Sequence, residues 1–190
     1  MIQKSSEGTL RLFIGIAVPP VIISRLDELV QRLKPLAPIR WTPDSNFHIT
    51  TKFIGAWPRY RLDTMAHALI PLRDSGLLRI AIRGLGFYPN ARRARIFWAG
   101  IDGGPPLAEL ANQTDRACAA LGVKPEEKRY SPHLTLARID SPSGLEALHE
   151  AIAVEPNPEF GEFIAGSFHL YESRPGSHGS VYTSLAEFPL

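Results

Sequence analysis

Two segments of the sequence repeat one pattern and constrain the fold more than any other feature. Residues 48–54 read HITTKFI and residues 133–139 read HLTLARI. Alternating apolar residues, many of them β-branched, predict a strand in each segment. With six histidines and eight threonines in the chain, random placement gives roughly 0.25 His-x-Thr triplets, yet two are present. We therefore expect a fold in which two equivalent strands meet.

Alternation along a strand decides which of these side chains share a face. His48 and Thr50 are two residues apart and point to one side, while Ile49 points to the other side, toward a core. His133, Thr135 and Leu134 repeat the arrangement. If the two strands lie side by side or across a pseudo-two-fold cleft, two imidazoles and two hydroxyls surround one centre.

This set of groups suits phosphoryl transfer. Imidazole titrates near neutral pH, so one histidine of a pair can accept a proton while the other donates one. The hydroxyls of Thr50 and Thr135, with nearby cations, can hold the non-bridging phosphate oxygens. Strict alternation also places Lys52 on the face of His48, which makes Lys52 a further phosphate-contact candidate.

The remaining periodicity indicates the α+β class. Helices are expected at 22–33, 61–73, 105–121 and 143–152, and strands at 12–18, 77–85, 95–101, 162–171 and 180–188. Strands in antiparallel runs with helices between them do not fit alternating βαβ units. Because no linker-like stretch divides the chain, we expect residues 1–190 to form a single domain.

Composition indicates the cellular compartment and limits the metals and cofactors that the protein could bind. The net charge of +2 indicates no general affinity for nucleic acid, and the single Cys118 excludes an internal disulfide framework. The sequence contains no run of about 18 apolar residues, which is the length needed to span a membrane. A soluble, cytoplasmic protein is therefore expected. Carboxylates and cysteines are absent at ligand spacing from the two motifs, so we expect no metal and no cofactor.

The paired motifs resemble those of the 2H phosphoesterase superfamily, in particular the bacterial RNA 2′,3′-cyclic phosphodiesterases, long called 2′-5′ RNA ligases. The resemblance rests on four stretches between residues 11 and 138, which are RLFIGIAVPP, RWTPDSNFHITTKFIG, FYPNARRARIFWAGI and PEEKRYSPHLTLAR. A weaker similarity extends to the segment near the C-terminus.

The resemblance implies a bilobal α+β fold of two antiparallel sheets with outer helices around a central cleft. It implies metal-independent opening of RNA 2′,3′-cyclic phosphate ends to 2′-phosphates, with His48 as proton donor and His133 as proton acceptor. Thr50, Thr135 and Arg138 would contact the phosphate. Arg138 has the opposite parity to His133, so it reaches the site only if the strand bends. A monomer with RNA as its partner is expected.

Other residues keep two interpretations. A segment that mixes cations with aromatics could bind RNA or could be a basic turn before a packed strand; it comprises Phe87, Tyr88, Arg92, Arg93, Arg95, Phe97 and Trp98. Residues flanking the motifs could line a cleft or serve packing: Trp41, Lys128, Arg129 and Tyr130. Among the other histidines, His67 and His149 are expected on helix surfaces, His178 in a glycine-rich loop, and His169 is left open.

Alternative functions use the same site. The two histidines could join RNA ends through a 2′-5′ bond or hydrolyse a small cyclic nucleotide, because each reaction places one phosphodiester between them. A non-catalytic protein that binds RNA ends belongs to a different class, and intact histidines and threonines in both motifs argue against it.

Overall fold

The computed structural model describes residues 8–73, 76–141, 143–154, 157–176 and 179–190. Within these residues the chain forms four α-helices and nine strands, which confirms the α+β class. The helices are α1 (Pro20–Leu33), α2 (Leu62–Leu69), α3 (Gly104–Ala120) and α4 (Glu146–Val154). The strands are β1 (Thr9–Ala17), β2 (Arg40–Trp41), β3 (His48–Pro58), β4 (Leu78–Tyr88), β5 (Ile96–Asp102), β6 (His133–Arg138), β7 (Glu159–Ala165), β8 (Ser167–Gly176) and β9 (Gly179–Pro189).

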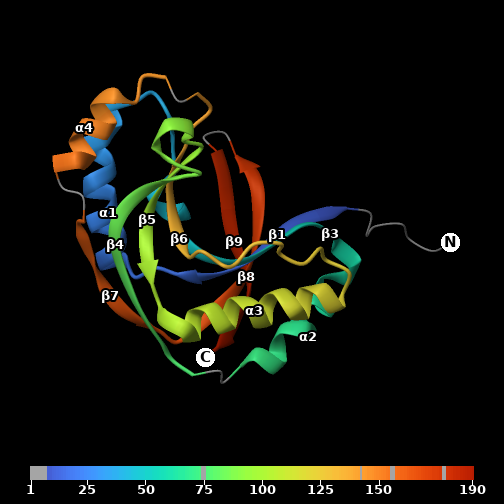
Figure 1. Cartoon of the computed structure of the whole chain (residues 1–190). Coiled ribbons are helices and arrows are strands. Elements are labelled where there is room, and N and C mark those ends of the chain that lie inside the picture. Colours follow the sequence, from blue (N-terminus) through green and yellow to red (C-terminus); the bar gives the residue numbers. More distant parts are fainter. Residues whose placement is uncertain (1–7, 74–75, 142, 155–156, 177–178) are drawn as a thin grey trace.

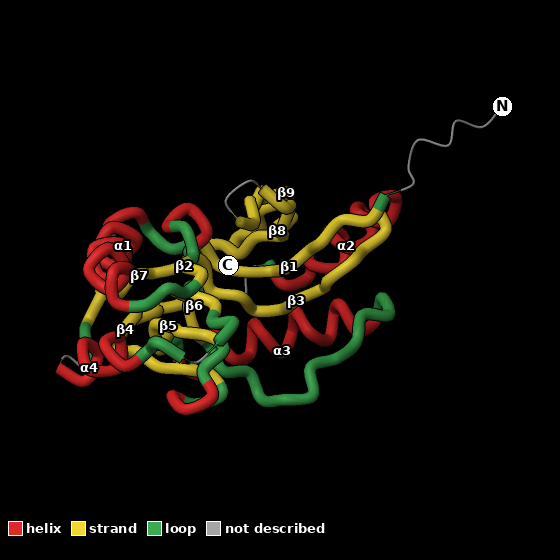
Figure 2. The backbone as a smooth tube through the Cα atoms, turned by 90° about the horizontal axis from the view of Figure 1, so that it is seen from above, coloured by secondary structure: helices red, strands yellow, loops and turns green. Residues whose placement is uncertain are grey.

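The strands form two antiparallel sheets, as expected. One has four strands in the order β3-β1-β8-β9, and the other has five in the order β2-β6-β5-β4-β7. Helices α1 and α4 lie beside β4 and β7 of the five-stranded sheet, whereas α2 and α3 lie beside β1 and β3 (Figures 1 and 2). No helix in the described part of the chain is long and apolar enough to cross a membrane.

The chain passes between the two sheets in a way that brings the motif strands together. From β1 it continues into α1, which packs against β7 of the other sheet, and then returns to β3. From β5 it continues into α3, which packs against β3, and then returns to β6. Both motif strands thus follow a helix packed on the opposite sheet, and β3 and β6 contact each other.

One strand prediction was wrong in an informative way. The apolar alternation over 162–171 predicts a single strand, but the chain forms β7 and β8, separated by Gly166 and placed in different sheets. Each strand buries one face, but the phase of the alternation shifts at Gly166, since Ala165 and Phe168 are both buried although they are three residues apart. The two-residue β2 was not predicted, since it is too short to show a period.

Candidate active site

Each repeated motif lies at the start of a strand and has the predicted alternation. Ile49 in β3 and Leu134 in β6 are fully buried. Burial of such a side chain contributes about 1.5–3 kcal/mol to stability. His48 and Thr50 are only half-buried, as are His133 and Thr135. The buried middle residue therefore fixes each strand, and the polar pair faces the other side.

Both imidazoles are oriented by the same backbone contact. Nδ1 of His48 lies 2.7 Å from the carbonyl oxygen of Asn46, and Nδ1 of His133 lies 2.9 Å from that of Ser131. A carbonyl oxygen only accepts, so Nδ1 carries the proton in both rings and Nε2 is left for chemistry. The Thr50 hydroxyl lies 3.0 Å from Nε2 of His48 and donates to it.

The two histidines are close enough for their charges to interact. Burial lowers the pKa of His48 to about 4 against the ordinary 6.5, the Asn46 carbonyl opposes that shift, and the charges of His133 and Arg138 add to it. Burial also lowers the pKa of His133, with a further lowering from Arg138. The structure thus brings both histidines and Arg138 together from two sheets.

A β-bulge explains how Arg138 reaches this site despite its parity. Ala137 pairs with Phe97 and Thr135 pairs with Trp98, so Leu136 is an extra residue in β6. Leu136 and Ala137 are consecutive and both fully buried. The bulge reverses the alternation beyond Thr135, which returns Arg138 to the side of the histidine.

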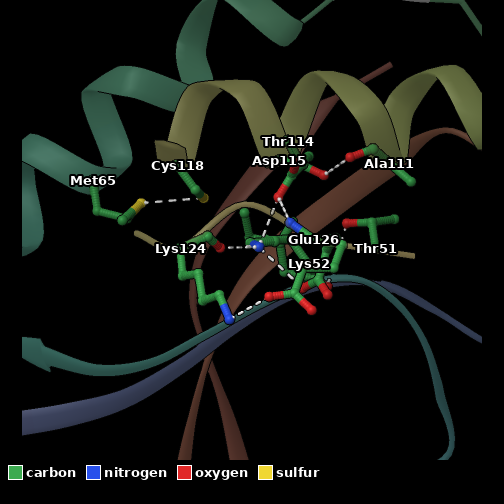
Figure 3. Close-up of polar contacts among 11 residues, drawn as sticks. Thr51, Lys52, Met65, Ala111, Thr114, Asp115, Cys118, Lys124 and Glu126 are labelled. Carbon is green, nitrogen blue, oxygen red and sulfur yellow. Dashed lines mark hydrogen bonds and ion pairs between the residues drawn. The ribbon is translucent and has the colours of Figure 1, made fainter. Parts of the chain in front are cut away.

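A corresponding β-bulge in β3 makes the predicted position of Lys52 wrong. Thr51 is the extra residue there, because Lys52 pairs with Ile14 and Thr50 pairs with Gly15. Lys52 therefore points away from the face of His48 and is 2% exposed. Its ammonium group is bound by protein oxygens near α3 (Figure 3), so the structure does not support Lys52 as a phosphate contact.

Aromatic side chains surround both histidines, and the sequence did not identify those around His48. The centroid of the His48 ring lies 4.7 Å from that of Phe13 and 5.1 Å from that of Tyr182, and the Phe13 ring stacks on Tyr171. These rings come from β1, β8 and β9. No local sequence signal could have indicated the cluster, because sheet pairing assembles it.

On the other sheet, Tyr88 and Trp98 flank the second histidine. The centroid of the Tyr88 ring lies 5.0 Å from that of His133 and 5.2 Å from that of Trp98. Phe97, in contrast, is fully buried and serves packing. The mixed cationic and aromatic segment therefore divides by strand face, with Tyr88 and Trp98 near the histidine and Phe97 in the core.

Gly15 allows β1 to pass close to the first motif. A Cβ atom at Gly15 would lie 2.8 Å from the backbone oxygen of Ile49 and 3.5 Å from Cδ2 of His48. A backbone oxygen within a sheet cannot move away cheaply. The glycine inside the apolar run 12–18 was the available sequence signal for this close approach.

A pocket of about 420 Å³ adjoins His133, and it is lined by three of the four residues that the sequence assigned either to a cleft or to packing. It is bounded by β3, α3 and the connection that precedes β6, and Lys128, Arg129 and Tyr130 are among its lining residues. Trp41 lies elsewhere, with its ring against Phe97. Three further cations lie at or beside the exposed turn between β4 and β5: Arg92, Arg93 and Arg95.

Tyr130 ties this connection to the first motif. Its hydroxyl donates to the carbonyl oxygen of Thr50 at 2.8 Å, and burial raises the pKa of the phenol. We expect Tyr130→Phe to lower the free energy of unfolding by about 1 kcal/mol, because a buried carbonyl loses its donor. Urea unfolding measures this loss. Tyr60→Phe, at an exposed tyrosine, is the matched control, and equal stabilities of both variants would contradict the prediction.

The other histidines differ in their surroundings. His67 is exposed on α2, as expected, but His149 on α4 is half-buried against Phe87. His169 on β8 lies between the hydroxyls of Ser167 and Ser184. His178 lies outside the described residues. Within the described ranges, no three His, Cys, Asp or Glu side chains are grouped as metal ligands.

Comparison with known proteins places this site in a family context. A family model described as LigT-like phosphoesterase matches residues 16–98 and 102–182. A protein from Aeropyrum pernix named RNA 2′,3′-cyclic phosphodiesterase is 32% identical over 151 residues, which are 79% of this chain and 85% of that protein. One of the same name from Methanocaldococcus jannaschii is 27% identical over 94% of this chain and its own full length.

Solved structures share the fold over nearly the whole chain. A protein from Thermus thermophilus superposes with a TM-score of 0.79 at 26% identity, covering 95% of this chain and 98% of that one. The crystal structure of E. coli LigT complexed with 3′-AMP gives a TM-score of 0.79 at 22% identity, over 96% and 99% of the two chains.

Proposed function

Because this chain belongs to the LigT-like phosphoesterase family, we propose that it hydrolyses RNA 2′,3′-cyclic phosphate ends to 2′-phosphates. The observation that carries the proposal is the matched orientation of His48 and His133, each with Nδ1 held by a carbonyl oxygen two residues earlier. Two relatives that align over most of the chain bear the name RNA 2′,3′-cyclic phosphodiesterase, which supports the choice of substrate.

In the proposed reaction the two histidines act on opposite sides of the phosphorus. Nε2 of His133 takes a proton from water, whose oxygen forms a bond to phosphorus. The bond from phosphorus to the 3′-oxygen breaks, and His48 gives its proton to that oxygen. The product is a 2′-phosphate with a free 3′-hydroxyl. His133 then releases its added proton to solvent and His48 takes one up from solvent, which restores the starting state.

The other groups of the site stabilise the phosphate. The charge of Arg138 acts at both histidines, so the guanidinium can bind the non-bridging oxygens between them. Thr50 and Thr135 supply hydroxyls on the same strand faces. Since each sheet provides one histidine, we treat residues 1–190 as one catalytic unit with two lobes.

The lowered pKa values predict an acidic optimum for the free enzyme. His48 must be protonated and His133 neutral, with pKa values of about 4 and below 6.5 respectively. The fraction of enzyme with His48 protonated and His133 neutral is greatest between their two pKa values, so we expect a bell-shaped kcat/KM profile with one limb near pH 4 and its optimum below pH 6.5. Phosphate between the rings favours imidazolium, so the kcat profile shifts to higher pH.

Rates measured from pH 3.5 to 9 on a cyclic-phosphate oligonucleotide test this expectation. An alkaline limb of kcat/KM above pH 7, or a kcat profile displaced to lower pH than kcat/KM, would contradict it.

A substrate panel in EDTA tests the proposed function. The wild-type protein is incubated with an oligonucleotide ending in a 2′,3′-cyclic phosphate, with a 2′,3′-cyclic mononucleotide, and with the cyclic-phosphate oligonucleotide plus a 5′-hydroxyl RNA. We expect the oligonucleotide to give the highest kcat/KM and a 2′-phosphate product. Faster mononucleotide hydrolysis, net 2′-5′ joining, a 3′-phosphate product, or binding without turnover would each overturn the proposal.

A further inference from the structure

An ion cluster lies behind the first motif, around the buried side chain of Lys52. The ammonium group of Lys52 lies 2.7 Å from the Asp115 carboxylate, 3.0 Å from that of Glu126 and 2.9 Å from the carbonyl oxygen of Lys124. Figure 3 shows these oxygens converging on the nitrogen from α3 and from the connection that follows it. Three partners match the three donors of an ammonium group.

Two carboxylates, those of Asp115 and Glu126, face the single positive charge of Lys52 in this cluster. Burial disfavours the ammonium, but the hydrogen bonds from Lys52 to Asp115 and Glu126 outweigh it and raise the lysine pKa above its ordinary value. A buried ion pair adds little stability compared with apolar side chains of similar volume, whereas it specifies a fixed geometry. The cluster therefore suggests a positional role for Lys52.

The part of the chain that Lys52 holds is the segment leading into the second motif. Residues 121–132 contain no helix or strand, and they lead directly into His133, the first residue of β6. Lys52 binds this segment at Lys124 and Glu126, and the backbone nitrogen of Glu126 donates to Asp115 at 3.1 Å.

Lys52 is also tied to the first motif and to the pocket beside the second. It lies four residues after His48 on the same strand, with the bulge at Thr51 between them. Lys52, Asp115 and Glu126 line the pocket that adjoins His133. One side chain thus links the strand of the first histidine to the segment that delivers the second.

We propose that Lys52 is a positioning residue that fixes the segment 121–132, and with it His133, relative to His48. This role extends the proposed function, because it concerns the distance and orientation between the two histidines. Small misplacement of a catalytic group can cost about 10²-fold in rate, so the positioning should appear in kcat.

Two variants test the proposal. Lys52→Met removes the ammonium but leaves two carboxylates without their cation. A triple variant, Lys52→Met with Asp115→Asn and Glu126→Gln, also removes those charges and tests the role if the single variant fails to fold. In both, we expect hydrogen exchange of residues 121–132 to accelerate on the order of tenfold, the NMR titration of His133 to shift, and kcat to fall by about 10²-fold.

Two controls separate positioning from general destabilisation. Arg116→Met removes another ion pair of α3, the 2.7 Å contact with Glu109, which lies on the exposed surface. Leu148→Ala truncates a fully buried residue of α4 and lowers the melting temperature. We expect both to keep wild-type exchange in 121–132 and wild-type kcat.

The outcomes decide the proposal in either direction. Native exchange, His133 titration and kcat in the triple variant would overturn it, as would an equal loss of kcat in Leu148→Ala. If the wild-type protein does not cleave cyclic phosphates, the proposed function fails. The exchange and titration measurements, which need no substrate, then decide the role of Lys52 alone.

Discussion

Replacement of His48 or His133 by alanine is expected to lower kcat/KM on a 2′,3′-cyclic-phosphate oligonucleotide by about 10²–10⁴-fold. Each variant removes one proton transfer: His48→Ala leaves the 3′-oxygen to depart without a proton, and His133→Ala leaves water without a base. Initial rates in EDTA measure both losses, and circular dichroism with thermal melting establishes that each variant folds.

His169→Ala provides the matched control for these variants. His169 is a half-buried histidine of β8, held by two serine hydroxyls, and it has no role in the proposed reaction. We expect its kcat/KM to remain within about threefold of wild type, since its ring bonds to serine hydroxyls and takes part in neither proton transfer. Wild-type rates in both His48→Ala and His133→Ala would contradict the acid–base assignment.

Replacement of Arg138 by alanine is expected to lower kcat/KM by about 10–100-fold. A hydrogen bond to a charged group contributes about 1.5–3 kcal/mol, and each 1.36 kcal/mol changes the rate tenfold. Because the charge of Arg138 lowers the pKa of both His48 and His133, its removal raises both values. The pH profile of kcat/KM should therefore move to higher pH.

Arg40→Ala distinguishes the role of Arg138 from that of any nearby cation. Arg40 pairs with Arg138 between β2 and β6, but its guanidinium binds the exposed Asp140 at 2.7 Å. We expect Arg40→Ala to leave the rate and the pH profile unchanged. A wild-type profile in Arg138→Ala would remove that residue from the site, and an equal shift in Arg40→Ala would show a non-specific charge effect.

The sequence was sufficient to predict the fold class and the equivalent positions of His48 and His133 on two strands. His48 and His133 could be identified because each lies in a strand whose buried middle residue, Ile49 or Leu134, fixes the direction of its neighbours. Two-residue periodicity carries that information directly. The two antiparallel sheets were implied by the family resemblance. The single strand predicted over 162–171 was wrong, because the alternation shifts by one residue at Gly166, where the chain passes from one sheet to the other.

The two cations near the motifs show where alternation stops being informative. A bulge at Thr51 turns Lys52 into the interior, and the corresponding bulge at Leu136 returns Arg138 to the side of His133. Strict alternation predicted the first position wrongly and made the second depend on a bend. A bulge is one extra residue in the ladder, so it becomes visible only when the pairing partners are known.

The surroundings of the histidines could not be predicted for a different reason. Phe13 of β1 meets Tyr171 and Tyr182 around His48, and these two come from the consecutive strands β8 and β9 at the other end of the sequence. Their convergence depends on strand order, which no local pattern encodes. The lowered pKa of His48 follows from this burial and is therefore a property of the assembled sheets.

The central claim is that His48 and His133, carried by separate sheets, act as one acid–base pair. A double-mutant cycle tests it most directly, with 2′-phosphate formation followed in EDTA for wild type, His48→Ala, His133→Ala and the double variant. Residues that act as a unit show strongly non-additive losses. We predict that the double variant loses no more than about tenfold beyond the weaker single variant. Losses that multiply, so that each histidine contributes independently, would contradict the account.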